Sequence, residues 1–491
     1  MPLKLPAQNE QCGQPVAGAA RRGGVSATGY RLRYTQSNSE AIMKSPALAV
    51  VALLPAAYAL FAGDITYTAD VAPILYKHCA TCHHPDDIAP MSLLSYQQTR
   101  PWAAAIREAV LTRQMPPWKA DPHYGKWSND WSLTEAEIAT IKAWVDQGAK
   151  EGDPRNLPAP PVFSTDWRIG KPDLIISIPP HSLTADGPDE YENFTVPTNF
   201  TEDKWIVAAE LRPTNRGIVH HAHVFVNAPA KPKPATSKTP DPPNPQSAYT
   251  DWLKVHEGKL SWMRPEAPVI DDGCIVDDNS YWPGDKPRDE NFGNWGLISS
   301  YLPGRGPDIY PQGTARKIPA GSNLGFQIHY SKATKKPEID VTSVGLIFAK
   351  GPPKQAAKRV DLSNYFFRIP AGDPNVEVTE CHTFKQDMYL TSLTPHMHLR
   401  GKDARFEATY PDGRQETLLL VPHYNFNWQI TYRMDQPKFI PKGTRLAIVS
   451  HFDNSPNNPL NPDPTKVVRW GEASEMEMMD GWIEYLDADL R

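Results

Sequence analysis

From residue 166 to the C-terminus, short apolar runs alternate with turn residues, and this pattern limits the possible fold more than any other feature. The runs are rich in β-branched and aromatic residues, and Pro, Gly, Asn and Asp separate them. No long amphipathic helical pattern intervenes, which favours antiparallel β-sandwiches over βαβ units. The clearest runs are 173–178, 218–226, 324–330, 344–349, 388–399, 404–410 and 445–452.

The length of this region fits two successive sandwiches. We expect a boundary near Gly351-Pro352-Pro353, which gives one domain at 166–350 and another at 351–491. A Pro-rich and Lys-rich run at 228–245 has no strand pattern and is expected to be an exposed insertion. Proline contributes 51 of the 491 residues, about twice the usual share, which indicates many ordered loops.

The region from 64 to 150 has a helical pattern instead. In its clearest helix Thr134 and Glu137 form a capping box, apolar residues share one face, and Gly148 ends the helix. That face consists of Ile138, Ile141, Trp144 and Val145. A Pro-rich linker follows at 151–165. The predicted fold class is therefore mixed and multidomain, with a small all-α domain before two antiparallel β-sandwich domains.

The segment 43–62 indicates export. It starts with Met43, continues as an apolar run and contains the small-x-small pattern Ala57-Tyr58-Ala59, as secretory signal peptides do. Residues 1–42 lack hydrophobic periodicity and are interpreted as a mis-assigned extension before the true start. The mature chain is expected to be periplasmic or secreted, without a stable membrane span.

Charge and cysteine content exclude two further classes of protein. The formal net charge is −5 at pH 7 and the mature chain has no basic run, so no nucleic-acid partner is expected. Five cysteines are too few for a disulfide scaffold. Cys274 and Cys381 are able to pair, but the sequence does not decide whether they do.

The stretch Cys79-Ala80-Thr81-Cys82-His83 is a C-x-x-C-H motif. The two thiols of such a motif attach to the haem vinyl groups, and the adjacent histidine becomes an axial iron ligand. A redox dithiol or half of a zinc site is less favoured, because neither a βαβ pattern nor a second cysteine pair accompanies the motif. We therefore expect one covalent haem c, bound through Cys79, Cys82 and His83.

Met115 is the best candidate for the sixth iron ligand. It lies far enough after His83 for the chain to wrap round the ring, whereas Met91 lies too close. A methionine more often fills a core, but the region 64–150 as a whole resembles a small cytochrome c domain with Met115 in its distal loop. That resemblance implies His/Met ligation and an electron carrier of raised potential.

Histidines and methionines gather on the predicted strands. Residues i and i+2 of a strand point to one face, so His396 and His398 can reach the same metal. By the same rule His221 pairs with His223 rather than with His220. His329 is a further donor, and three thioethers follow at Met476, Met478 and Met479. A Met cluster is usually core, but a thioether beside two imidazoles makes a soft site suited to copper.

The order of these motifs resembles the copper type II ascorbate-dependent monooxygenases, a family that includes the peptidylglycine α-hydroxylating and dopamine β-hydroxylating enzymes. The resemblance rests on four motifs in this order along the chain: His220-His221, Gln327-Ile328-His329-Tyr330, His396-Met397-His398 and Glu477-Met478. It implies two jelly-roll domains with one copper each. The electron-transferring site would consist of His220, His221 and His329. The oxygen-activating site would consist of His396, His398 and Met478, with Met476 and Met479 as alternatives. It also predicts a distorted strand at His220 and a packing role for His223.

The chain also departs from this family. Peptide-amidating members hold the substrate carboxylate with Arg, Asn and Tyr, and the corresponding positions here are Thr394, Asp480 and Trp482. A peptide C-terminus is therefore a disfavoured substrate. Cys381 matches a disulfide cysteine of the family, but its usual partner beyond the methionine is missing. The added haem region resembles bacterial fusions of cytochrome c with this monooxygenase.

The expected function is hydroxylation of a C–H bond in a small organic substrate with O₂. An external donor would reduce the haem, and the haem would refill the two coppers one electron at a time. The alternative is a periplasmic electron-transfer or copper-binding protein without hydroxylase activity, which would need the same haem motif. A zinc hydrolase is disfavoured, because no acidic residue near the first histidines is identifiable as a general base.

Overall fold

A computed structural model describes residues 63–227 and 296–488, apart from short gaps at 86–88, 90, 164–165, 188, 303–304, 333, 365–366 and 472. The predicted extension at 1–42, signal peptide at 43–62 and insertion at 228–245 lie outside the described residues, as does Cys274. The chain divides into two units, Pro2–Asp64 and Ile65–Arg491, and all the elements described belong to the second.

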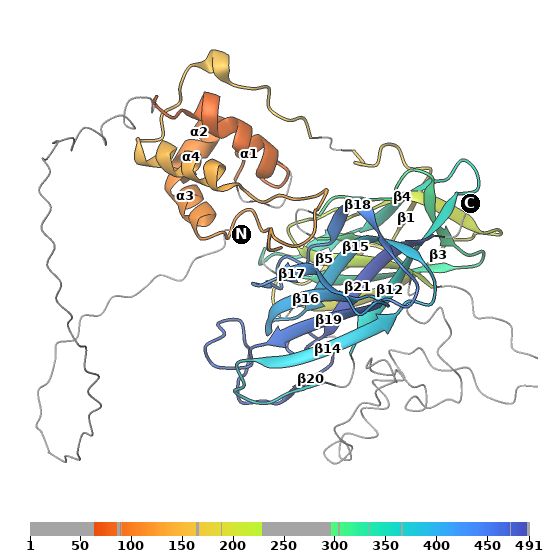
Figure 1. Cartoon of the computed structure of the whole chain (residues 1–491). Coiled ribbons are helices and arrows are strands. Elements are labelled where there is room, and N and C mark those ends of the chain that lie inside the picture. Colours follow the sequence, from red (N-terminus) through yellow and green to blue (C-terminus); the bar gives the residue numbers. More distant parts are fainter. Residues whose placement is uncertain are drawn as a thin grey trace, which may run out of the picture. The chain divides into compact units, whose positions relative to one another are not determined.

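Helices occupy the first part of the second unit (Figure 1). They are η1 (Tyr67–Val71), α1 (Ala72–His78), α2 (Tyr96–Thr99), η2 (Arg100–Trp102), α3 (Ala103–Leu111), α4 (Glu135–Asp146) and η3 (Pro154–Asn156). The predicted capping box of α4 is confirmed: the Thr134 hydroxyl accepts from the Glu137 N–H at 3.2 Å, and the Glu137 carboxylate accepts from the Thr134 N–H at 2.7 Å. Trp144 and Ile141 of α4 are fully buried against Leu75 of α1.

Most of the described chain after residue 173 is β-strand, and within the described residues its largest sheet has nine strands. Their order is β1-β11-β4-β8-β12-β21-β15-β18, and β7 also pairs with β4. The bounds are β1 (Leu174–Ser177), β4 (Lys204–Arg212), β7 (Asp308–Ile309), β8 (Thr314–Ile318), β11 (Ser343–Phe348), β12 (Gln355–Ser363), β15 (Met388–Met397), β18 (Tyr432–Ile440) and β21 (Met479–Asp487).

Two four-stranded sheets have the orders β3-β9-β5-β6 and β14-β19-β16-β17, and the second is visible as a row of neighbouring strands in Figure 1. Their bounds are β3 (Glu190–Pro197), β5 (Val219–Asn227), β6 (Gly296–Tyr301), β9 (Asn323–Tyr330), β14 (Val376–Thr383), β16 (Gly401–Thr409), β17 (Gln415–Val421) and β19 (Arg445–Phe452). Two short pairs join β2 (His181–Leu183) to β10 (Glu338–Asp340) and β13 (Arg368–Ile369) to β20 (Val468–Arg469).

Each four-stranded sheet packs on one half of the nine-stranded sheet through an apolar core. The core of the first half includes Ile206, Leu211, Val344 and Leu346 from the large sheet and Val224, Phe326 and Ile328 from the small one. The core of the second half includes Leu390, Leu393 and Ile483 from the large sheet and Phe406, Ile448 and Phe452 from the small one. Two antiparallel sandwich-like halves result, which agrees with the predicted β-rich architecture.

The two halves share one sheet, which the sequence did not predict. The expected boundary at 350/351 falls between β11 and β12, but β12 also pairs in parallel with β8, at Gln355↔Thr314 and Ala356↔Ala315. Asp308 of the first half adds an ion pair with Arg433 of the second at 3.1 Å. The halves are therefore held in a defined orientation.

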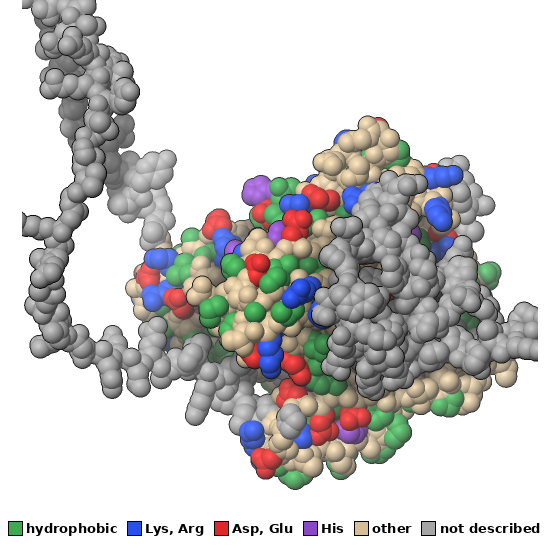
Figure 2. Space-filling view, turned by 90° about the horizontal axis from the view of Figure 1, so that it is seen from below, with side chains coloured by type: hydrophobic (Ala, Val, Ile, Leu, Met, Phe, Trp, Pro, Cys, Tyr) green, Lys and Arg blue, Asp and Glu red, His purple; other side chains and the backbone are tan. Residues whose placement is uncertain are grey.

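None of the helices described is long and apolar enough to cross a membrane. On the described part of the face in Figure 2, acidic and basic side chains are interspersed without a large patch of either sign.

The capping box of α4 gives a first testable prediction. Thr134→Ala removes the acceptor for the Glu137 N–H, so the free energy of local opening at the start of α4 should fall by about 1 kcal/mol. Hydrogen exchange followed by mass spectrometry should then show about fivefold faster exchange of these amides. The control is Thr140→Ala, farther along α4, which should not accelerate exchange because alanine is the better helix former. Equal exchange in Thr134→Ala and the wild type would contradict the role of the cap.

Candidate metal centres

The first candidate centre forms where strand β5 is distorted. Val219 lies opposite Tyr330 of β9, but the next paired residue is His221, opposite His329, so His220 is an extra residue in β5. Such a bulge lets adjacent residues turn toward the same side. The distortion predicted at His220 is therefore confirmed, and strand periodicity alone was wrong to turn His220 away from His221.

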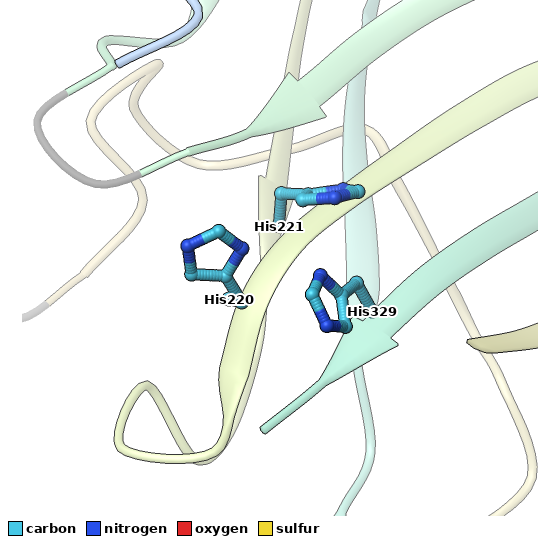
Figure 3. Close-up of side chains that lie close together, drawn as sticks. All are labelled: His220, His221 and His329. Carbon is cyan, nitrogen blue, oxygen red and sulfur yellow. The ribbon is translucent and has the colours of Figure 1, made fainter. Parts of the chain in front are cut away.

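His220, His221 and His329 converge at this bulge (Figure 3). One ring nitrogen from each of the three side chains lies within 4.8 Å of the others. The Nδ1 atoms of all three are buried and have no hydrogen-bond partner within the part of the chain described. Buried polar atoms are nearly always paired, so three unpaired nitrogens in one place fit a bound metal ion.

The surroundings hold these imidazoles neutral. Burial lowers the pKa of His220 to about 4 and lowers the pKa values of His221 and His329 as well. Neutral imidazole is the form that ligates metals. Asp189 orients His329 through a contact of 3.0 Å to Nε2, which leaves Nδ1 toward the cluster. The donor set therefore fits a cation that prefers nitrogen ligands, such as copper or zinc.

His223 does not complete this set. Its Nδ1 atom lies 2.8 Å from the Ser300 hydroxyl, and its ring centroid lies 5.2 Å from that of His221. Burial lowers the pKa of His223 to about 3. A hydrogen-bonded neutral ring beside the cluster agrees with the packing role expected for His223.

The second candidate centre contains His396 and His398, at the end of β15. The ring centroids of the two histidines are 5.3 Å apart. The Nδ1 atom of His396 lies 2.8 Å from the Gln429 side-chain oxygen, and that of His398 lies 3.3 Å from the Met476 carbonyl oxygen. Each ring therefore uses Nδ1 to fix its orientation and keeps Nε2 for a ligand. Burial lowers their pKa values to about 4 and about 3.

Strand alternation selects among the three methionines. Met479 pairs with Met397 in the register between β21 and β15, and both side chains are fully buried in the core. His396 is one residue from this core position and points to the opposite side of the sheet, whereas Met478 lies just before β21 and packs, partly buried, against the same core. The sulfur of Met476 packs over Gly471. The register thus places Met479 in the core, away from the two histidines.

Glu477 connects the methionine segment to the histidine pair. Its fully buried carboxylate accepts hydrogen bonds from the backbone N–H groups of His398 at 2.8 Å and Arg400 at 2.6 Å. The Arg400 guanidinium lies 4.0 Å away, and burial raises the pKa of Glu477 to about 8. Arg400 is itself buried and donates to the Glu475 carbonyl at 2.9 Å. These contacts hold Met478 next to the end of β15.

Aromatic side chains bring the two centres into one neighbourhood. The Phe426 ring lies 6.2 Å from His220 and 5.6 Å from His398, measured between centroids. Trp482 stacks on His396 at 5.1 Å and lies 6.0 Å from His223. The two histidine groups, which come from different halves of the chain, therefore face each other across Phe426 and Trp482.

The space beside these rings is small. A cavity of about 10 Å³ is lined by Ser300, Thr394, Gln429 and Trp482 together with the guanidinium-bearing side chains of Arg305 and Arg359. Such a volume holds about one water molecule. Arg359 lies over the Trp482 ring at 4.4 Å. In this conformation the rings are closely covered by protein.

The C-x-x-C-H motif follows α1, and the structure describes its two thiols and its histidine. Neither Cys79 nor Cys82 forms a disulfide, and the His83 Nδ1 atom lies 3.2 Å from the Met91 carbonyl oxygen. That contact leaves the Nε2 atom of His83 for an iron ligand. Burial lowers the pKa of His83, which favours the neutral ligand form. Met115 is partly buried, and among the described residues Met91 rather than Met115 packs on the helical core.

Another group of possible ligands does not behave as a metal site. His181, Glu190 and Glu192 lie close enough to hold an ion. The Lys332 ammonium already contacts Glu190 at 2.6 Å, and this lysine is 9% exposed. A buried ammonium thus supplies the positive charge that these carboxylates require.

Several contributors were not found from the sequence. Gln429, Phe426 and Asp189 lie in loops or at strand ends, where no periodic pattern marks them, and only the tertiary fold brings them to the histidines. Trp482 shares strand parity with Met478, a signal that the sequence does contain. Cys381 is disulfide-bonded. Because neither Cys79 nor Cys82 forms a disulfide, the partner of Cys381 lies outside the described residues.

Comparison with known proteins does not add a function. No family model matches the chain, and no curated protein matches it. Among solved structures, the major capsid protein P2 from bacteriophage PM2 is 10% identical with a TM-score of 0.22, over 61% of this chain and 97% of that chain. A Paenibacillus xanthan lyase is 11% identical with a TM-score of 0.15, over 68% and 28%. Similarities this low do not bear on the activity.

The depressed histidine pKa values predict how stability depends on pH. A buried histidine whose folded pKa is about 4, as for His396, stabilises the fold above pH 6.5, and this stabilisation is lost as the pH falls from about 6.5 to about 4. For the metal-free protein, the His396 contribution should fall by about 2 kcal/mol between pH 7 and pH 5.

The His396 contribution to the free energy of unfolding is measured by urea unfolding at both pH values. The two proteins compared are the chelator-treated wild type and His396→Asn. The variant should lose less free energy of unfolding on acidification than the wild type does. An equal pH dependence in both proteins would show that His396 is not held neutral by its surroundings.

Proposed function

We propose that the protein is an exported copper-dependent monooxygenase that hydroxylates a C–H bond with O₂ and receives electrons through a c-type haem. The observation that carries the proposal is the convergence of His220, His221 and His329, with three unpaired buried Nδ1 atoms. A second histidine pair faces this group across Phe426. The order of these residues along the chain resembles the copper type II monooxygenases.

Bound copper would supply one-electron redox chemistry toward O₂. His220, His221 and His329 would hold one ion through Nδ1, with Asp189 orienting His329. His396 and His398 would hold the other through Nε2, since their Nδ1 atoms are engaged, and Met478 would complete the set. Glu477 positions Met478 and His398 relative to each other. Phe426 and Trp482 keep water from the imidazoles.

Bound haem would supply an electron store outside the copper sites. Cys79 and Cys82 would form the thioether links, and His83 would ligate the iron through Nε2 while the Met91 carbonyl holds its other nitrogen. Met115 is the proposed opposite ligand, by resemblance to cytochrome c. The region 64–150 would then be the cytochrome c domain, and the two sandwich-like halves would be the jelly-roll copper domains.

One observation favours the second candidate, an electron-transfer or copper-binding protein without hydroxylase activity. The cavity beside Trp482 measures about 10 Å³, which is far below the roughly 300 Å³ or more of a pocket for a small organic ligand. A hydroxylase would then either open this cavity or bind its substrate elsewhere beside His396 and His398. A carrier that only exchanges electrons requires no such opening.

Metal content tests the assignment of the thioether. Purified wild type should contain one haem and two coppers. Met478→Leu should retain haem and the first copper but bind the second about 10- to 100-fold more weakly. Met476→Leu is the matched control, because its sulfur packs over Gly471, and it should keep both coppers. Loss of copper in Met476→Leu with retention in Met478→Leu would reverse the assignment.

Oxygen uptake separates the two candidate functions. A monooxygenase reduced with ascorbate should consume O₂, and Met478→Leu should slow this consumption markedly. A carrier should exchange electrons with its donor and consume no more O₂ than the Met478→Leu protein. If the wild type binds at most one copper after careful reconstitution, the second copper centre is contradicted for both candidate functions.

A further inference from the structure

The segment 118–131, which lies between α3 and α4, docks on the second sandwich. Trp127 forms an antiparallel bridge with Met434 of β18. The Ser128 N–H donates to the Arg433 carbonyl and the Asp435 N–H donates to the Lys126 carbonyl, both at 2.9 Å. The segment therefore continues the nine-stranded sheet beyond β18, its last strand.

Side chains fasten the same contact. The Asn129 amide donates to the Thr431 carbonyl at 2.8 Å and accepts from the Arg433 N–H at 3.0 Å. Trp118 is 8% exposed, belongs to the core of the second sandwich, and lies 4.9 Å from the Tyr432 ring. Polar and apolar contacts together fix the segment on β18.

The other end of this segment reaches the haem motif. The Trp131 carbonyl lies 3.1 Å from Nδ1 of His78, the residue immediately before Cys79. The Trp131 and Trp118 rings are 6.2 Å apart. A continuous set of contacts thus runs from the motif through Trp131 and Trp118 to Tyr432.

Beyond Tyr432, further contacts of the neighbouring residues reach His396. Thr394, two residues before His396 on β15, donates to the Thr431 hydroxyl at 2.9 Å. Gln429, which bonds His396, lines a small cavity together with Asn129, Trp131 and Thr431. In the part of the chain described, the backbone and Asn129 hydrogen bonds of the segment go to the second sandwich, not to β5 or β9.

We infer that segment 118–131 is the electron-delivery interface from the haem to the His396 and His398 centre. This inference rests on the proposed function. In each transfer the ferrous haem iron is oxidised to ferric and one copper(II) is reduced to copper(I). One electron moves, no bond is made or broken, and no proton has to follow.

The rate of transfer tests the interface. Anaerobic protein loaded with haem and copper(II) is flash-reduced at the haem by a photoexcited flavin with a sacrificial amine donor. Reoxidation of the ferrous haem is followed by its absorbance, and loss of the copper(II) signal by electron paramagnetic resonance. Trp118→Leu should slow reoxidation about tenfold or more, an increase of about 1.4 kcal/mol in the barrier. The matched control is Trp102→Leu, at a tryptophan 40% exposed on η2, and it should react like the wild type.

A second variant tests the interface independently of any folding defect in Trp118→Leu. Asn129→Ala removes two hydrogen bonds of the interface without emptying the core, and it should also slow the reoxidation. Unchanged rates in a folded Trp118→Leu protein and in Asn129→Ala would overturn the inference.

Deletion of each centre tests which one accepts the electron. His220→Ala should keep the fast phase of haem reoxidation, whereas His396→Ala should lose it. The opposite pattern would overturn the inference while leaving the proposed function intact. Wild type that lacks haem or copper on metal analysis would instead overturn the proposed function, and the inference with it.

Discussion

Burial of imidazole rings is the constraint on which the candidate centres depend. A buried histidine must be neutral, and each of its ring nitrogens then needs a partner. His223, His396 and His398 satisfy this need at Nδ1 with Ser300, Gln429 and a backbone carbonyl. The Nδ1 atoms of the first cluster do not. The fold thus stabilises two kinds of site, one that presents Nδ1 and one that presents Nε2, and a metal ion would remove the cost of the unpaired nitrogens.

The closeness of the two centres follows from the shared sheet. Because β12 pairs with β8 and also with β21, the two halves share one sheet, and the contact between Asp308 and Arg433 braces them. Strand β15, which carries His396, belongs to that sheet, whereas β5 and β9, which carry the first histidine group, form part of the four-stranded sheet packed on its other half. Phe426 and Trp482 then fill the space between the groups. Independent sandwiches on a flexible linker would not hold these rings at contact distance.

The sequence contained part of this arrangement. The strands at 218–226, 324–330 and 388–399 and the capping box of α4 followed from local pattern, because burial on one face imposes a period on the side chains. Periodicity placed His221 with His223, whereas motif order placed His220 with His221, and the bulge supports motif order. Gln429, Asp189 and the pairing of β8 with β12 could not be predicted, because long-range packing alone determines them.

The docked segment also covers part of an open edge of the nine-stranded sheet. Strand β18 is the last strand of the nine-stranded sheet, and an open edge with unpaired N–H and C=O groups invites pairing with other chains. Residues 126–129 cover part of that edge, and Trp118 adds apolar burial beside Tyr432. The same contacts that protect the edge bring the C-x-x-C-H region close to the strand next to His396. Edge protection and electron delivery would then depend on one interface, so a change that frees the edge should also separate the redox centres.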